Sequence, residues 1–123
     1  MTDIPDHRSQ WDAYGELWVI ADVAARRDAC DGVLATGCTY TDPSVHAEGI
    51  EEILAYMTQF QQNAPGGHFV TQDFLEHHDR SLARWTMVLG DGTVVGTGAS
   101  FATYDADGAL TSMTGFSDAP AGS

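Results

Sequence analysis

Basic residues are scarce in this sequence. Lysine and arginine together number 5 against 18 aspartate and glutamate residues, which gives a formal net charge of −13 at pH 7. A phosphate backbone or an anionic membrane surface would repel such a chain. We therefore expect neither nucleic acid nor a membrane as a partner.

Cysteines and long apolar runs are also few. The two cysteines, Cys30 and Cys38, form no CxxC pair and show no Cys/His spacing typical of zinc, so we predict no metal site. No apolar run approaches the roughly 18 residues that a membrane span requires, and the N-terminus lacks the features of a secretion signal. The cytoplasm is the expected location.

Helical periodicity dominates the first part of the chain. At 123 residues the sequence has the size of one domain, which we expect to span 1–123 with an ordered core at about 8–118. Apolar residues recur at three- and four-residue steps over 8–28 and predict one long amphipathic helix. Residues 28–37 predict a short second helix, capped by Asp28, before an extended stretch at 38–42.

A third helix and a series of strands follow. The apolar face of that helix is marked by Ile50, Ile53, Leu54, Met57 and Phe60. After Gly67 the period changes to two, and four strands are predicted at 68–78, 81–89, 93–105 and 109–117. Short turns between them imply an antiparallel sheet, so the fold class is α+β, with helices on one face of a curved sheet and room for a cavity.

Several short motifs occur in a suggestive order. They are YTDP (40–43), EGIEEILAYM (48–57), HHD (77–79), ARW (83–85), GDGTVVGTG (90–98) and DADGALTSMTGFSD (105–118). In this order and spacing the chain resembles a SnoaL-like protein of the nuclear transport factor 2-like superfamily. The resemblance implies a cone-shaped fold, in which N-terminal helices pack on a strongly curved, mainly antiparallel sheet that encloses an apolar pocket. It also implies a homodimer that associates through the sheet.

The same resemblance implies roles for three residues. Asp42 falls where the related ketosteroid isomerases keep their catalytic base. Their oxyanion-binding tyrosine would fall on Trp18, and their second oxyanion donor, an aspartic acid, on Ser100. Indole and hydroxyl groups are weaker donors, so catalysis supported by Trp18 and Ser100 would be slower than in those enzymes.

Two interpretations of Asp42 stay open. A carboxylate that loses hydration against apolar walls becomes a better base toward a carbon acid. Alternatively, Asp42 precedes Pro43 and only closes the turn after a strand. His46 raises the same choice, since it could shuttle protons near neutral pH or lie solvated in a loop.

A pocket wall is predicted from strand parity and the helical stripes. Its expected members are Tyr14, Tyr40, Leu54, Met57, His68, Trp85, Met87, Ala102 and Met113. Each of them could equally belong to a filled hydrophobic core.

Two classes of function remain. One is a cofactor-free enzyme of the isomerase, cyclase or dehydratase type, which performs acid–base chemistry on a small apolar, carbonyl-bearing molecule resembling a polyketide or terpenoid. The other is a module of the same fold that binds a ligand or associates without chemistry. Replacing Asp42 by asparagine distinguishes them, because only the enzyme would lose turnover.

Overall fold

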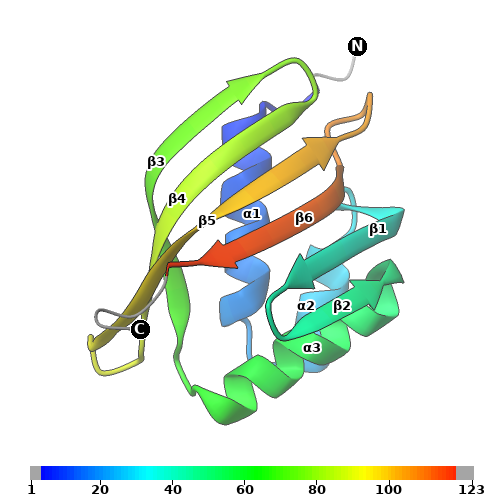
Figure 1. Ribbon diagram of the computed structural model, residues 1–123. Coiled ribbons are helices and arrows are strands. Elements are labelled where there is room, and N and C mark those ends of the chain that lie inside the picture. The colour runs from blue at the N-terminus through cyan, green and yellow to red at the C-terminus, as the bar shows by residue number, and fades with distance from the viewer. Residues whose placement is uncertain (1–3, 119–123) are drawn as a thin grey trace.

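The computed structural model describes residues 4–118. Its elements are α1 (His7–Val19), α2 (Val23–Ala29), β1 (Leu34–Asp42), β2 (Val45–Glu48), α3 (Gly49–Asn63), β3 (His68–His77), β4 (Arg80–Val88), β5 (Val94–Tyr104) and β6 (Leu110–Ser117) (Figure 1). Of the single domain expected over 1–123, residues 1–3 and 119–123 lie outside the described residues, whereas the expected ordered core at about 8–118 falls within them. No helix in the described part of the chain is long and apolar enough to cross a membrane.

The six strands form one mixed sheet in the order β2-β1-β6-β5-β4-β3. β1 pairs in parallel with β6, whereas all the other neighbouring pairs are antiparallel. Helix α1 lies across one face of this sheet, and α3 lies beside β1 and β2, with α2 packed against α3 (Figure 1). The predicted class is confirmed: this is a cone-shaped α+β fold in which the sheet stays open.

The prediction of one long helix over 8–28 is wrong. α1 ends at Val19, and a second helix begins after Asp22, whose side chain caps it by accepting a hydrogen bond of 2.8 Å from the Ala25 N–H. Aspartate is a favoured N-cap residue, and this cap competes with continuation of the first helix. The short helix predicted at 28–37 is also wrong, because β1 already begins at Leu34.

Arg26 fixes the angle between the two N-terminal helices. Its side chain is fully buried and donates from Nε to the Leu17 carbonyl at 3.0 Å and from Nη2 to the Ile20 carbonyl. Nη1 donates to Thr58 Oγ1 on α3. The guanidinium therefore satisfies carbonyls that the end of α1 leaves without helical partners.

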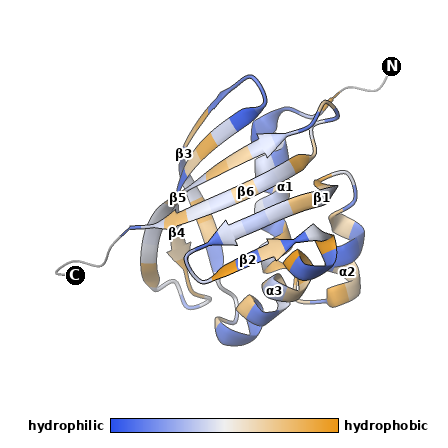
Figure 2. Ribbon diagram, turned by 45° about the vertical axis from the view of Figure 1, so that its right-hand side comes forward, coloured by the Kyte–Doolittle hydropathy of each residue, from blue (hydrophilic) through white to orange (hydrophobic). Residues whose placement is uncertain are grey.

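A hairpin that the sequence did not predict follows Asp42. Oδ1 of Asp42 accepts the backbone N–H of Ser44 at 2.7 Å and of Val45 at 3.0 Å, and β2 then runs back along β1. α3 starts directly after β2, and its predicted apolar face is confirmed, since Ile53, Leu54 and Met57 are buried. Both hydrophobic and hydrophilic residues appear on α3, as expected for a helix with one face on the sheet (Figure 2).

Two rows of paired residues distinguish the inner face of the sheet from its outer face. On the inner face Ala102 pairs with Met113, and both are buried. On the outer face Leu82 pairs with both Leu75 and Phe101, and all three remain exposed. The strand parity predicted from the sequence therefore holds along the middle of the sheet.

Candidate active site

A cavity of about 700 Å³ lies between α1, α3 and the inner face of the sheet. Aromatic side chains from each layer form much of its wall: Trp11, Tyr14, Trp18, Tyr40, Tyr56, Phe60, Phe69 and Trp85. The protein has 3 tryptophans, and all of them line this space. A volume of this size suits a small organic molecule.

Asp42 contributes a carboxylate to the cavity wall, at the end of β1. Its Oδ2 accepts the hydroxyl of Tyr40 at 2.7 Å and the hydroxyl of Tyr56 at 3.0 Å. Since Oδ1 binds two backbone N–H groups in the turn, four donors surround this one carboxylate. A carboxylate offers about four acceptor positions, so the arrangement fills all of them.

The phenols around Asp42 are held in their neutral form. Burial raises the pKa of Tyr56 to about 12, and its hydrogen bond to Asp42 acts in the same direction. Burial raises the pKa of Tyr40 even further, with added contributions from Tyr14 and from Asp42. Both hydroxyls therefore remain protonated, and can donate hydrogen bonds, over the whole physiological pH range.

Tyr14 places a third phenol at the cavity. Burial raises its pKa well above the ordinary value, although Trp18 beside it opposes the rise. Among residues 4–118 the Tyr14 hydroxyl donates no hydrogen bond, and Tyr14 lines the cavity. A ligand acceptor would give this hydroxyl the partner that the protein does not supply.

Ser100 and Asp42 face the same open space. Ser100 Oγ accepts the Trp85 indole N–H at 2.9 Å, which leaves its own O–H proton available. A side chain at Gly115 would lie 3.5 Å from Ser100 Oγ and 3.7 Å from Asp42 Cβ. Because glycine occupies this position, the cavity reaches both groups.

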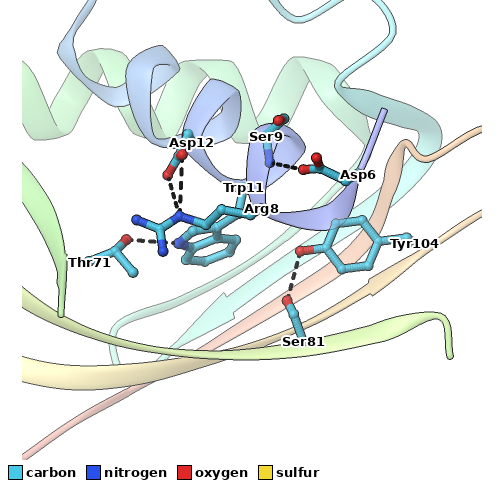
Figure 3. A network of polar contacts seen from close by, with 8 residues as sticks. All are labelled: Asp6, Arg8, Ser9, Trp11, Asp12, Thr71, Ser81 and Tyr104. Carbon is cyan, nitrogen blue, oxygen red and sulfur yellow. Dashed lines mark hydrogen bonds and ion pairs between the residues drawn. The ribbon is translucent and has the colours of Figure 1, made fainter. Parts of the chain in front are cut away.

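Polar contacts from α1 form another part of the wall, where Arg8 binds Asp12 through Nε at 3.1 and 3.3 Å (Figure 3). The Trp11 indole N–H donates to Thr71 Oγ1 at 3.1 Å and ties α1 to β3 (Figure 3). The Arg8 guanidinium also lies 5.5 Å from the centre of the Phe74 ring. The positive charge of Arg8 is therefore already engaged within the protein.

The structure brings together many of the residues predicted from the sequence. Those that line the cavity are Asp42, Trp18, Ser100, Tyr14, Tyr40, His68, Trp85 and Met87. The others predicted for the wall lie instead in the buried core, outside the cavity lining: Leu54, Met57, Ala102 and Met113. Periodicity correctly predicts that these side chains point inward. An inward side chain can pack into the core, however, instead of lining the cavity.

His46 lies away from the cavity. It is exposed on β2, with Nδ1 2.7 Å from Thr41 Oγ1 and Nε2 3.1 Å from Glu48 Oε1. It pairs across the hairpin with Thr41, whereas Asp42 pairs with Val45. Because neighbouring residues in a strand point to opposite faces, His46 and Asp42 point away from each other. The structure therefore does not bring this histidine to the carboxylate.

Tyr56 is the main site residue that sequence reasoning missed. It lies three positions after Ile53 on α3, so its side chain belongs to the helical stripe already recognised. Trp11 lies on the predicted stripe of α1 in the same way, and Phe69 lies in the first long strand. Extending the helical spacing to every aromatic residue on the two helices would have identified Tyr56 and Trp11.

Neither thiol is suited to nucleophilic chemistry. Cys30 and Cys38 are both free and buried, and burial raises the pKa of Cys38 to about 11. A thiol in that state supplies little thiolate at neutral pH. Within the described part of the chain, no three His, Cys, Asp or Glu side chains are grouped to hold a metal ion.

Comparison with known proteins places this geometry in a family. The family model for the SnoaL-like domain matches residues 13–113. A SnoaL-like family protein from Agrobacterium tumefaciens, named as a candidate isomerase, has 25% identical residues and a TM-score of 0.84, over 92% of this chain and 97% of that one. No curated protein matches the chain.

More distant crystal structures share the fold. A candidate SnoaL-like polyketide cyclase from Jannaschia superposes with a TM-score of 0.68 at 18% identity, over 96% of this chain and 91% of that chain. A nuclear transport factor 2-like protein of unknown function from Exiguobacterium gives 0.71 at 19% identity, over 90% and 99%. The chain therefore belongs to the SnoaL-like domain family, and its fold is that of nuclear transport factor 2-like proteins.

Proposed function

We propose that the protein is a cofactor-free enzyme of the isomerase, cyclase or dehydratase type, which acts on a small, largely apolar molecule with a carbonyl group. The observation that carries this proposal is the Asp42 carboxylate, held by two neutral phenols in the wall of an aromatic cavity. A base beside hydrogen-bond donors suits removal of a proton next to a carbonyl. The named relatives, a candidate isomerase and a candidate polyketide cyclase, support the same class.

The proposed reaction exchanges one hydrogen bond for another. The Tyr56 bond to Oδ2, at 3.0 Å, is longer than the Tyr40 bond at 2.7 Å, and we assign it as the one released. A ligand carbonyl then accepts the Tyr56 O–H, which frees a lone pair on Asp42 Oδ2. Polarising the carbonyl and exposing the base thus occur together.

Proton transfer follows from this arrangement. Asp42 takes a proton from the carbon next to the carbonyl, and the bonding electrons move to the carbonyl oxygen as an enolate. Tyr56, with Ser100 or Tyr14 where the ligand reaches them, donates to that oxygen. For isomerisation, Asp42 then returns the proton to another carbon. For cyclisation, the enolate carbon attacks a second carbonyl, whose oxygen takes the proton from Asp42. For dehydration, the enolate expels a β-hydroxyl group, which leaves as water with that proton.

The composition of the chain supports acid–base chemistry over covalent catalysis. The sequence contains no lysine, so a Schiff base on a lysine amine is excluded. Both cysteines are buried away from the cavity lining. The reactive groups left in the wall are carboxylates, phenols, an imidazole and hydroxyls.

The full hydrogen bonding of Asp42 favours a second candidate, a binding module without chemistry. Two backbone N–H groups and two phenols already occupy the carboxylate, as expected of a residue that closes a turn and orders a cavity. Releasing Tyr56 for catalysis costs the net value of one such bond, about 1.5–3 kcal/mol when the acceptor is charged. A bound carbonyl offsets that cost only if it accepts the released hydroxyl well.

Native mass spectrometry with product analysis tests the choice. The protein is presented with a library of apolar ketones and polyketide-like compounds, and retained ligand and converted product are both recorded. We expect Asp42→Asn to convert ligand at least about 10²-fold more slowly than the wild type while it still retains ligand. Asparagine keeps an oxygen for the Ser44 and Val45 N–H groups, so the turn is preserved.

Tyr56→Phe provides the second variant. Loss of one carbonyl donor should slow conversion by about 10²-fold, whereas the binding-module candidate predicts no conversion by any variant. Conversion by Asp42→Asn at the wild-type rate would remove Asp42 as the base. Ligand retained without conversion by wild type and variants alike would establish the binding module instead.

A further inference from the structure

We propose that the ligand of this cavity carries a cationic nitrogen, such as an ammonium group, in addition to its apolar body. This inference rests on the proposed function only in taking the same cavity as the ligand site. It narrows the class of ligand from apolar carbonyl compounds to amine-bearing ones, and it applies equally to a substrate or to a ligand that is only bound.

The charges of the cavity wall give the first argument. Four charged side chains line it: Arg8, Asp12, Glu16 and Asp42. Arg8 and Asp12 neutralise each other through two contacts of 3.1 and 3.3 Å. Within residues 4–118 no basic side chain forms an ion pair with Glu16 or Asp42. Glu16 and Asp42 therefore contribute two negative charges that no basic side chain in this part of the chain neutralises.

The field of these charges is not confined to the cavity. The chain as a whole carries a formal net charge of −13, which adds to the negative charge at the cavity. Clefts of one charge sign with walls of low dielectric constant focus such a field on the ligand. An anionic ligand is repelled in this setting, and a cation is attracted.

The aromatic rings give the second, independent argument. The rings of Tyr56 and Phe60 each meet the Trp18 ring at 88°, with centroids 5.8 and 5.3 Å away. The Phe69 ring in turn meets the Trp85 ring at 82°, with centroids 5.1 Å apart. Aromatic side chains from the helices and from the sheet thus line the same cavity, and the electron-rich faces of such rings attract cations.

A matched pair of probes separates charge from shape. Benzyltrimethylammonium and neopentylbenzene have the same size and outline, but only the first is charged. Binding is followed by quenching of tryptophan fluorescence, because all 3 tryptophans of the chain line the cavity. The hydrophobic effect alone favours the neutral hydrocarbon, so tighter binding of the cation requires an electrostatic cause. We expect the cation to bind about tenfold more tightly.

Variants that neutralise one carboxylate each identify which charges attract the cation. Glu16→Gln and Asp42→Asn should each weaken binding of the cation about threefold to tenfold, and leave neopentylbenzene binding unchanged. Asp107→Asn is the matched control, since this exposed residue lies in the turn between β5 and β6 and removes the same charge from the chain. Its effect at 0.15 M salt should be negligible, because screening acts over about 8 Å.

Three results would overturn the inference. The first is hydrocarbon binding as tight as the cation, which leaves the cavity as a ligand site and the proposed enzyme intact. The second is an equal loss of cation binding in Asp107→Asn, which assigns the attraction to overall charge. The third is no binding of either probe, which removes this ligand class. Failure of the proposed enzyme is seen separately, as absence of conversion with any carbonyl compound.

Discussion

Gly98 shows how closely a single position on β5 is tied to the cavity wall. A Cβ added there would clash with the Phe116 carbonyl oxygen and lie 2.5 Å from the Trp85 ring. Gly98→Ala should therefore displace the Trp85 side chain or the adjacent strand and destabilise the protein by about 1–3 kcal/mol. Urea unfolding measures the change, and a shift of tryptophan fluorescence in the folded state reports the movement.

Gly96 provides the control for that prediction. It lies on the same strand two residues earlier, and a Cβ added there meets no atom within 4 Å. Gly96→Ala should leave stability unchanged or raise it slightly, because alanine reduces the freedom of the unfolded chain. Equal destabilisation by both substitutions would mean that the clash with Trp85 is not the cause.

Single residues also show where sequence reasoning succeeds and where it stops. Asp42, Trp18 and Ser100 were selected by resemblance and line one cavity. Met57 and Met113 were expected in the wall and lie in the core, because periodicity gives the direction of a side chain but not whether another side chain fills the space before it. For the same reason, periodicity could not predict the hydrogen bonds between the phenols and Asp42.

At the scale of elements, Arg26 holds the two N-terminal helices and α3 together. Arg26→Met should destabilise the protein by about 3 kcal/mol, because it removes three hydrogen bonds and leaves the Leu17 and Ile20 carbonyls without that donor. Thermal or urea unfolding measures the loss. Since α1 forms one wall of the cavity, ligand binding should weaken too.

The neighbouring Arg27 offers a matched control. It is exposed and pairs with Glu51, so Arg27→Met removes the same charge from the same helix without burying an unsatisfied group. Its unfolding midpoint should stay close to that of the wild type. If Arg26→Met behaved likewise, the buried guanidinium would not be what fixes the helices.

Two elements were mispredicted for local reasons. The break after α1 depends on Asp22 as a cap and on the buried Arg26, and neither shows in a pattern of apolar spacing. The strand β2 was missed because four residues are too few to show a period. The third helix and the last four strands, with long regular patterns, are confirmed within a few residues.

The folded protein should keep its tyrosines un-ionised to a higher pH than the unfolded chain does. Burial raises the pKa of all 4 tyrosines, and that of Tyr56 and Tyr104 to about 12. A group whose pKa is higher in the folded state contributes stability that is full below its unfolded value, about 10, and is lost as the pH rises through about 12.

Ultraviolet absorbance of tyrosinate measures this effect. At pH 10 the folded protein should show little tyrosinate, whereas the same protein in urea should show about half of its tyrosines ionised. Above that pH, ionisation and loss of helical circular dichroism should occur together. Tyrosines that titrate near their ordinary value in the folded protein would contradict the burial described for Tyr14 and Tyr40.

Association through the sheet is the expected assembly of the molecule. The outer row of Leu75, Leu82 and Phe101 is exposed, and Phe116 is 64% exposed on the last strand. We predict a homodimer across this surface that strengthens with salt, because a charge of −13 on each copy opposes association. Sedimentation velocity at two salt concentrations measures it.

Leu82→Glu tests which surface is used. A charge in the middle of the outer row should give a monomer, whereas Val23→Glu on the exposed face of α2 should not change assembly. A dimer that persists in Leu82→Glu but is lost in Val23→Glu would place the interface on the helices.

The parallel pairing of β1 with β6 has a consequence for synthesis of the chain. β1 is made early and ends at Asp42, but its sheet neighbour on the inner side begins only at Leu110. A nascent chain can form the β1–β2 hairpin and the meander from β3 to β5, yet no strand joins these two parts of the sheet until β6 leaves the ribosome. The wall that carries Asp42 is thus completed only after β6 has been made, and no fragment that lacks β6 can display a finished binding site.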